Sequence, residues 1–156
     1  MKFIFFIPFI MLLSLQAQEL KIVANSFDAD EKKGITVFNG DVKITKGFDK
    51  LNAQVVKVFT DSNHTPTKYI ANGKVTFYIK SENNAIYQGK AGKAIFYPLK
   101  KEYHFYTNVN IKQLDQKKQI IGEEVVINTV AGTAKASGGK KGPVIMTFEL
   151  QEETKK

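Results

Sequence analysis

The chain contains no cysteine, no tryptophan and no arginine among its 156 residues, and only two histidines. Without cysteine it cannot form disulfides, thiolate metal sites or a lipid-attachment site of the lipobox type. Without arginine it lacks the bidentate fork that nucleotide clamps commonly use. Because the usual pairs of nucleophile and base are nearly impossible to assemble from these residues, we predict no enzymatic activity. His64 and His104 are forty residues apart in the sequence, and no spacing places carboxylates beside them, so we predict no metal site and no cofactor.

All 23 cationic residues are lysines, and with 15 acidic residues they give a net charge of +8. A hydrophobic content of 43% over this length is sufficient for one core. The lysines have three interpretations, which the residues leave open. They can form a nucleic-acid face, keep sheet surfaces and edges soluble, or lie near the phosphates of an anionic amphiphile.

The first 17 residues have the pattern of a secretory signal peptide. Lys2 is followed by an almost wholly apolar run, residues 3–15, that contains Pro8. This run is shorter than the about 20 residues needed to span a bilayer. We therefore expect cleavage after Ala17, export to the periplasm, a folded domain over residues 18–150 and a polar tail over residues 151–156. Export argues against nucleic acid as a partner.

Apolar and polar residues alternate with period two along most of the mature chain. The clearest runs are residues 69–80, 103–111 and 144–150. Such alternation predicts strands with one apolar face and one wet face, as in antiparallel sheets, so the chain is expected to be all-β.

A short motif recurs along the chain. Asn39-Gly40-Asp41-Val42 is followed 33 residues later by Asn72-Gly73-Lys74-Val75, and more loosely by residues 106–109. The repetition predicts about three copies of an up-and-down strand pair, with a first strand at residues 20–25 and a last strand at residues 144–150.

The inward-facing residues are expected to change parity across the first motif. Ile35 and Val37 are odd-numbered candidates, whereas Val42 and Ile44 are even-numbered. Such a slip requires either a bulged corner within one strand or a tight hairpin at Asn39-Gly40. The recurrence of the motif favours the corner.

Residues 22–30, 37–44 and 51–58 resemble the repeated signature of the OstA-like family, and the resemblance covers residues 20–150. It implies an open, twisted β-jellyroll in which two antiparallel sheets face each other as a V. It also implies a periplasmic protein that holds lipopolysaccharide in an apolar groove. The implied partners are lipopolysaccharide, an inner-membrane LptC-like protein at the N-terminal edge, an outer-membrane LptD-like protein at the C-terminal edge, and further copies of the chain, head to tail.

The alternation of apolar and polar residues, which predicts the inward-facing side chains, and the family resemblance together select two sets of site residues. The expected groove residues are Val37, Val42, Ile44, Leu51, Val75, Phe77, Ile79, Phe96, Phe105, Val109, Ile111, Val125 and Ile127. The expected partner-binding edges contain Leu20, Ile22, Val23, Val144, Met146, Phe148 and Leu150.

Other functions remain open at this point. A retained leader would indicate the membrane-anchored LptC of the same machinery. The lysines are also compatible with a secreted module that binds polyanions or carbohydrates. The expected partner-binding edges are compatible with a structural scaffold that assembles end to end. Asp61, Asn63 and Thr65 match a bacterial N-glycosylation acceptor in an expected loop.

Overall fold

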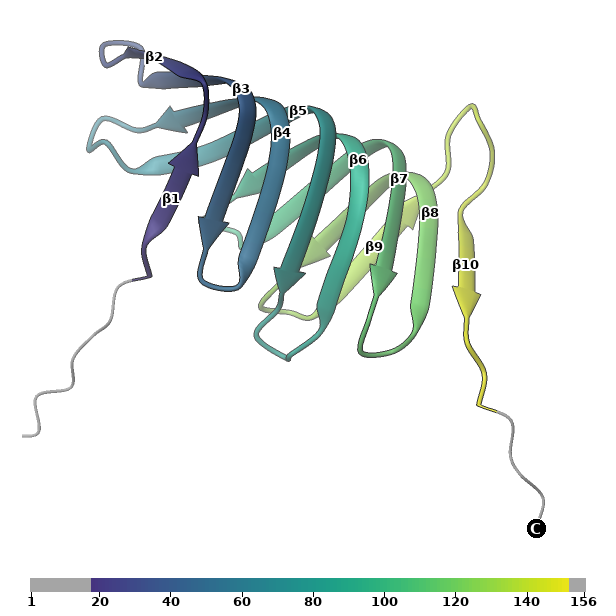
Figure 1. The fold of residues 1–156 in the computed structure, drawn as a ribbon. Coiled ribbons are helices and arrows are strands. Elements are labelled where there is room, and N and C mark those ends of the chain that lie inside the picture. The colour runs from purple at the N-terminus through teal and green to yellow at the C-terminus, as the bar shows by residue number, and fades with distance from the viewer. Residues whose placement is uncertain (1–17, 152–156) are drawn as a thin grey trace, which may run out of the picture.

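The computed structural model describes residues 18–151, which form ten strands and no helix (Figure 1). The strands are β1 Leu20–Val23, β2 Ser26–Asp30, β3 Ile35–Lys46, β4 Asp49–Thr60, β5 Pro66–Lys80, β6 Ile86–Tyr97, β7 Glu102–Gln113, β8 Lys118–Asn128, β9 Thr133–Ser137 and β10 Ile145–Phe148. The all-β prediction is confirmed for this part of the chain. The predicted signal peptide and nearly all of the predicted tail lie outside the described residues.

The strands from β3 to β8 form an antiparallel meander in which each strand pairs with the next. Two short strands complete each end of the meander: β1 and β2 both pair with β3, and β9 and β10 both pair with β8. As a result, β1 and β10 lie at opposite ends of the molecule (Figure 1).

The long strands bend near their middles, and the bends divide the sheet into two halves that face each other. At each bend the register shifts, for example between Asn39 and Val42 and between Asn72 and Val75. We name the halves by their first strands. The β1 half-sheet contains β1, residues 42–46, 49–53, 75–80, 86–91, 109–113 and 118–122, and β10. The β2 half-sheet contains β2, residues 35–39, 55–59, 66–72, 93–97, 102–106 and 124–128, and β9.

The recurring Asn-Gly motif forms the bends of β3 and β5, so the corner interpretation is confirmed and the hairpin alternative is wrong. Each of these corners places two successive residues at positive φ, a conformation that glycine adopts without strain. The corner residues are Gly40 (φ 80), Asp41 (φ 44), Gly73 (φ 84) and Lys74 (φ 46), with Thr107 (φ 68) and Asn108 (φ 51) at the equivalent bend of β7.

The expected change of parity in β3 is wrong. Phe38 and Val42, both even-numbered, face the interior on either side of the corner, because its two left-handed residues preserve the alternation. Parity changes instead in the even-numbered strands, as in β4, where Ala53 and Val56 are both buried. Val37 pairs with Lys57 and lies on the outer face of the β2 half-sheet.

The core fills the space between the half-sheets. Its centre is an aromatic column in which Phe77 of the β1 half-sheet stacks on Phe105 of the β2 half-sheet, with ring centroids 3.9 Å apart. Tyr103 continues the column at 6.1 Å from Phe105, and Phe96 stacks on Tyr103 at 4.3 Å. The column therefore runs from the closed core to the place where the half-sheets separate.

Candidate functional site

The V is closed at the end formed by the last strands. The turn between β5 and β6 contacts the turn between β8 and β9, where the backbone N–H of Glu82 donates to the carbonyl of Thr129 at 3.0 Å. Ser81 and Ala85 of the first turn are buried at this junction, each with 3% of its surface exposed. The half-sheets are thus joined across their rims at this end.

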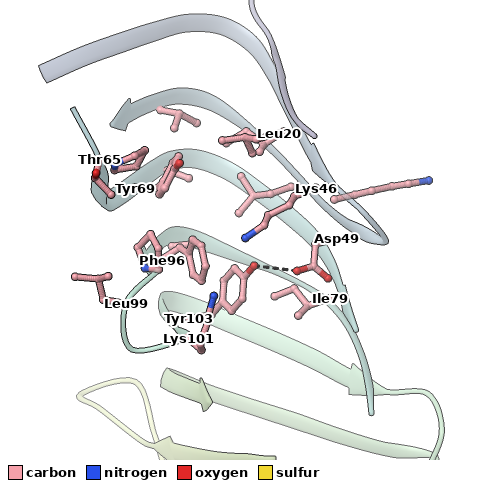
Figure 2. A pocket seen from close by; sticks show the side chains of 18 residues that line it. Leu20, Lys46, Asp49, Thr65, Tyr69, Ile79, Phe96, Leu99, Lys101 and Tyr103 are labelled. Atoms are coloured by element: carbon pink, nitrogen blue, oxygen red, sulfur yellow. Dashed lines mark hydrogen bonds between the residues drawn. The ribbon is translucent and has the colours of Figure 1, made fainter. Parts of the chain in front are cut away.

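Towards β1 the half-sheets separate and enclose a cavity of about 350 Å³, the apolar cavity (Figure 2). Its walls come from the inner faces of both half-sheets and from the turns before β5 and between β6 and β7. The apolar lining residues are Leu20, Ile44, Leu51, Val56, Pro66, Tyr69, Ala71, Ile79, Ala94, Phe96, Pro98, Leu99 and Tyr103. Lys46, Asp49, Lys50, Thr65 and Lys101 complete the lining.

The structure separates the predicted groove residues into three groups. Ile44, Leu51, Ile79 and Phe96 line the apolar cavity. Val37 does not, since it lies on the outer face. The remaining eight are buried in the closed core: Val42, Val75, Phe77, Phe105, Val109, Ile111, Val125 and Ile127.

Sequence reasoning missed several lining residues. Tyr69 and Tyr103 are the first residues of the alternating runs 69–80 and 103–111, so the same period-two alternation could have predicted that their side chains face inward. Pro98 and Leu99 belong to a turn, where no periodicity indicates direction. Their contribution depends on the path of the β6–β7 connection across the mouth of the V.

A hydrogen bond crosses the cavity and links the two half-sheets (Figure 2). The hydroxyl of Tyr103, on β7, donates to Oδ2 of Asp49, on β4, at 3.2 Å. Oδ1 of Asp49 accepts a second bond from the backbone N–H of Lys80 at 3.0 Å. Burial raises the pKa of Asp49 above its usual range, while these two bonds and the charge of Lys46 oppose the rise. Burial, together with the nearby Asp49 charge, raises the pKa of Tyr103 well above its usual value.

The raised pKa of Asp49 predicts a pH-dependent stability. The folded state binds this proton more tightly than the unfolded chain, so the stability from this carboxyl is full at low pH and is lost as pH rises through its folded-state pKa. Asp49→Asn removes the titration and keeps one oxygen to accept from the backbone N–H of Lys80, while its amide NH2 can donate to the hydroxyl oxygen of Tyr103. We expect its free energy of unfolding at pH 7 to equal or exceed the wild-type value by up to about 1 kcal/mol.

The measurement is urea unfolding between pH 4 and pH 7, followed by circular dichroism, for the wild type and Asp49→Asn. The two free-energy curves should converge towards low pH. Asp28→Asn, a change at an exposed carboxylate on β2, serves as the control and should follow the wild type. Parallel curves for Asp49→Asn and wild type would exclude the assigned role of Asp49.

The predicted edge residues occupy both ends of the sheet. Leu20 lines the apolar cavity, Ile22 and Val144 pack against the core, and Val23 is exposed. Met146 and Phe148 of β10 are 47% and 55% exposed, and Leu150 lies beyond the strand at 87%. Within residues 18–151, one edge of β1 and one edge of β10 have no strand beside them.

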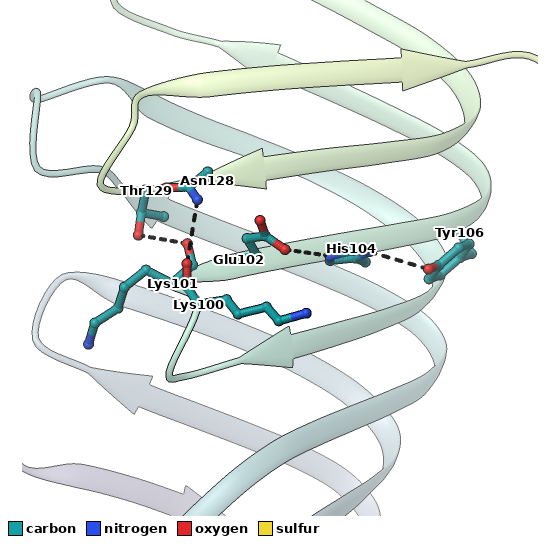
Figure 3. A network of polar contacts seen from close by, with 7 residues as sticks. All are labelled: Lys100, Lys101, Glu102, His104, Tyr106, Asn128 and Thr129. Atoms are coloured by element: carbon teal, nitrogen blue, oxygen red, sulfur yellow. Dashed lines mark hydrogen bonds and ion pairs between the residues drawn. The ribbon is translucent and has the colours of Figure 1, made fainter.

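A polar network on the outer face holds the turn between β6 and β7 in place (Figure 3). His104 Nε2 lies 3.0 Å from Glu102 Oε2, and this contact lowers the pKa of Glu102. Asn128 donates to the carbonyl of Lys100, and Thr129 donates to the carbonyl of Lys101 at 3.2 Å. These bonds fix the backbone from which the Lys101 side chain reaches the apolar cavity.

An open V of antiparallel half-sheets around an apolar cavity defines an open β-jellyroll. Residues 21–133 match the family described as LptA/(LptD N-terminal domain) LPS transport protein, and the chain belongs to this family. The resemblance to the OstA-like family is therefore confirmed. The family is one of transport proteins and not of enzymes.

The comparisons with individual proteins agree. The chain is 29% identical over 132 residues to the lipopolysaccharide export system protein LptH of Pseudomonas aeruginosa, covering 79% of this chain and 72% of LptH. The crystal structure of LptH, the LptA-homologous periplasmic component, superposes with a TM-score of 0.75 at 19% identity, over 85% of this chain and 96% of that one. The open-jellyroll prediction is confirmed by this superposition. Within residues 18–151 no helix is long and apolar enough to span a membrane.

Proposed function

We propose that the chain carries lipopolysaccharide across the periplasm with the acyl chains of lipid A held in the apolar cavity. The observation that carries this proposal is the cavity itself, which is open between the half-sheets and lined mainly by aliphatic and aromatic side chains. Its volume of about 350 Å³ lies within the range of about 300–1,000 Å³ that is usual for ligand pockets.

The energetics of acyl chains explain why such a cavity is needed. Burial of one methylene group is worth about 0.8 kcal/mol, so an acyl chain of about twelve carbons costs on the order of 10 kcal/mol to expose to water. A lipid with several chains cannot cross an aqueous compartment at this cost. Contact with Leu51 and Phe96 shields part of each chain without any chemical step.

The free edges support assembly into a longer conduit. In this proposal the β10 edge of one copy pairs with the β1 edge of the next, by addition of strands to an open sheet. The β1 edge of the first copy would pair with an inner-membrane LptC-like protein, and the β10 edge of the last with an outer-membrane LptD-like protein. Removal of residues 1–17 would release the mature chain, with its domain over 18–150 and tail over 151–156.

Site-specific photocrosslinking in cells tests the cavity. A photoreactive residue at Leu51 or Phe96, both in the cavity wall, should crosslink to labelled lipopolysaccharide. Their chain neighbours Asn52 and Ile95 point to the opposite face of the sheet and are the matched controls, for which we expect no crosslink. Phe105 is unsuitable because it is fully buried in the closed core.

The pattern of crosslinks decides between the candidate functions. Crosslinks at 51 and 96 alone support transport in the cavity. Equal labelling at all four positions, or none in a protein of normal circular dichroism, would contradict it. Labelling by a polyanion without acyl chains would favour the polyanion-binding module.

A further inference from the structure

We propose that Lys46, Lys80 and Lys101 form a subsite for the phosphorylated headgroup of the amphiphile whose acyl chains occupy the apolar cavity. This inference rests on the proposed function and assigns the polar end of the same ligand. It concerns a second cavity, also of about 350 Å³, which we call the polar cavity.

The two cavities adjoin each other. Five residues line both of them: Lys46, Asp49, Phe96, Lys101 and Tyr103. Beyond this boundary the walls of the polar cavity carry hydroxyl and amide groups, including those of Ser81, Asn84 and Thr129. An apolar compartment and a hydrogen-bonding compartment in contact match the two ends of an amphiphile.

The three lysines reach the polar cavity from three separate segments. Lys46 ends β3 and Lys80 ends β5, both in the β1 half-sheet, whereas Lys101 precedes β7 in the β2 half-sheet (Figure 2 shows Lys46 and Lys101). The Nζ of Lys46 lies 6.0 Å from the ring centroid of Phe96, at the boundary between the cavities. The Nζ of Lys80 lies 4.8 Å from the ring centroid of Phe48.

These ammonium groups are available for an anion. The ion pairs formed within residues 18–151 involve Lys33, His104 and Lys117, so none of the three lysines has a carboxylate within 4.0 Å there. The acidic groups in the lining are Asp49 and Glu82, and both carboxyl oxygens of Asp49 already accept hydrogen bonds from Tyr103 and from the backbone of Lys80. Three lysines against two carboxylates leave an excess of positive charge.

A phosphate monoester suits this arrangement. It carries nearly two negative charges and accepts several charge-assisted hydrogen bonds, and lysine binds phosphate as a mobile point charge. Lysines on both half-sheets would contact the phosphate while the attached acyl chains lie beside Phe96. The ligand class is therefore a phosphorylated glycolipid, and a free phosphorylated sugar shares only its polar chemistry.

The test compares two lipids and two pairs of substitutions. The lipids are bisphosphorylated hexa-acyl lipid A and the same lipid after enzymatic removal of its phosphates, both in detergent micelles. Lys46→Gln with Lys101→Gln should weaken binding of the phosphorylated lipid about tenfold more than binding of the dephosphorylated lipid. The control, Lys33→Gln with Lys117→Gln, removes the same charge from exposed ion pairs and should have no such effect.

A charge-retaining variant excludes a folding defect. Lys46→Arg with Lys101→Arg should restore binding of the phosphorylated lipid if positive charge at these positions is what matters. An equal loss for both lipids would overturn the subsite and leave the apolar cavity intact. Failure of the wild type to bind either lipid would overturn the proposed function itself.

A third ligand, glucosamine phosphate without acyl chains, identifies the source of the phosphate. We expect no detectable binding at concentrations that saturate the protein with lipid A. Comparable affinity with the same dependence on Lys46 and Lys101 would assign the polar cavity to a free phosphorylated sugar and overturn the amphiphile interpretation.

Discussion

Replacement of Phe105 by alanine is expected to lower the free energy of unfolding by about 3–5 kcal/mol. The side chain is 0% exposed and stacks on Phe77 of the opposite half-sheet at 3.9 Å, with Tyr103 parallel to it at 6.1 Å. Its removal leaves a cavity at the contact that holds the half-sheets together. A domain of this size has about 5–15 kcal/mol of stability in total, so the loss is a large share of it.

Urea unfolding followed by far-ultraviolet circular dichroism measures this loss, since the chain has no tryptophan for fluorescence. The matched control is Phe48→Ala, in the turn between β3 and β4, where the ring is 69% exposed. We expect the control to cost less than about 1 kcal/mol. Similar midpoints for Phe105→Ala and Phe48→Ala would show that the stacked pair does not join the half-sheets as described.

The periodicity of the sequence predicted much of this fold because strand alternation is a local property. Tyr69, Ala71, Val75, Phe77 and Ile79 face the interior as their common parity indicates. The recurrence of Asn-Gly also located two corners, since only a few residues adopt positive φ without strain. The alternation and the Asn-Gly motif both depend only on residues close together in the sequence, so the strands and corners can be predicted without a structure.

The composition of the apolar cavity depends on distances between the two half-sheets, and the alternation of residues along a strand does not predict these distances. Phe77 and Ile79 lie on the same face of β5, yet Phe77 is sealed by Phe105 and Ile79 reaches the apolar cavity. The angle between the half-sheets makes this difference. The bond from Tyr103 to Asp49 joins residues 54 positions apart, and no periodicity indicates such a pair. Val37 was misplaced because the change of parity occurs in β4 and not in β3.

The backbone of β10 presents every second residue to its free edge. Glu149 N–H donates to the carbonyl of Lys117 at 3.1 Å, which fixes the phase of hydrogen bonding between β10 and β8. In an antiparallel pair, hydrogen-bonded and non-bonded residue pairs alternate. Thr147, which lies opposite Gln119, therefore bonds to β8, whereas Phe148, opposite Lys118, directs its N–H to the free edge.

This phase makes two neighbouring proline substitutions opposite in their effects. Phe148→Pro removes a donor from the free edge and preserves the bonds to β8, so we expect a folded monomer that no longer assembles end to end. Thr147→Pro removes a bond to β8 and should detach β10 from the sheet. Light scattering over a range of protein concentrations measures assembly, and amide hydrogen exchange in β10 reports whether the strand stays paired.

The expected result is loss of assembly for both variants, with normal exchange protection of β10 only in Phe148→Pro. Assembly without protection of β10 would exclude this strand as the interface. If Phe148→Pro assembles like the wild type while its strand remains paired, copies of the chain meet through another surface. Loss of the N–H that position 148 directs to the free edge would then have had no effect on assembly. The proposed conduit would therefore have to continue through contacts other than those of β10.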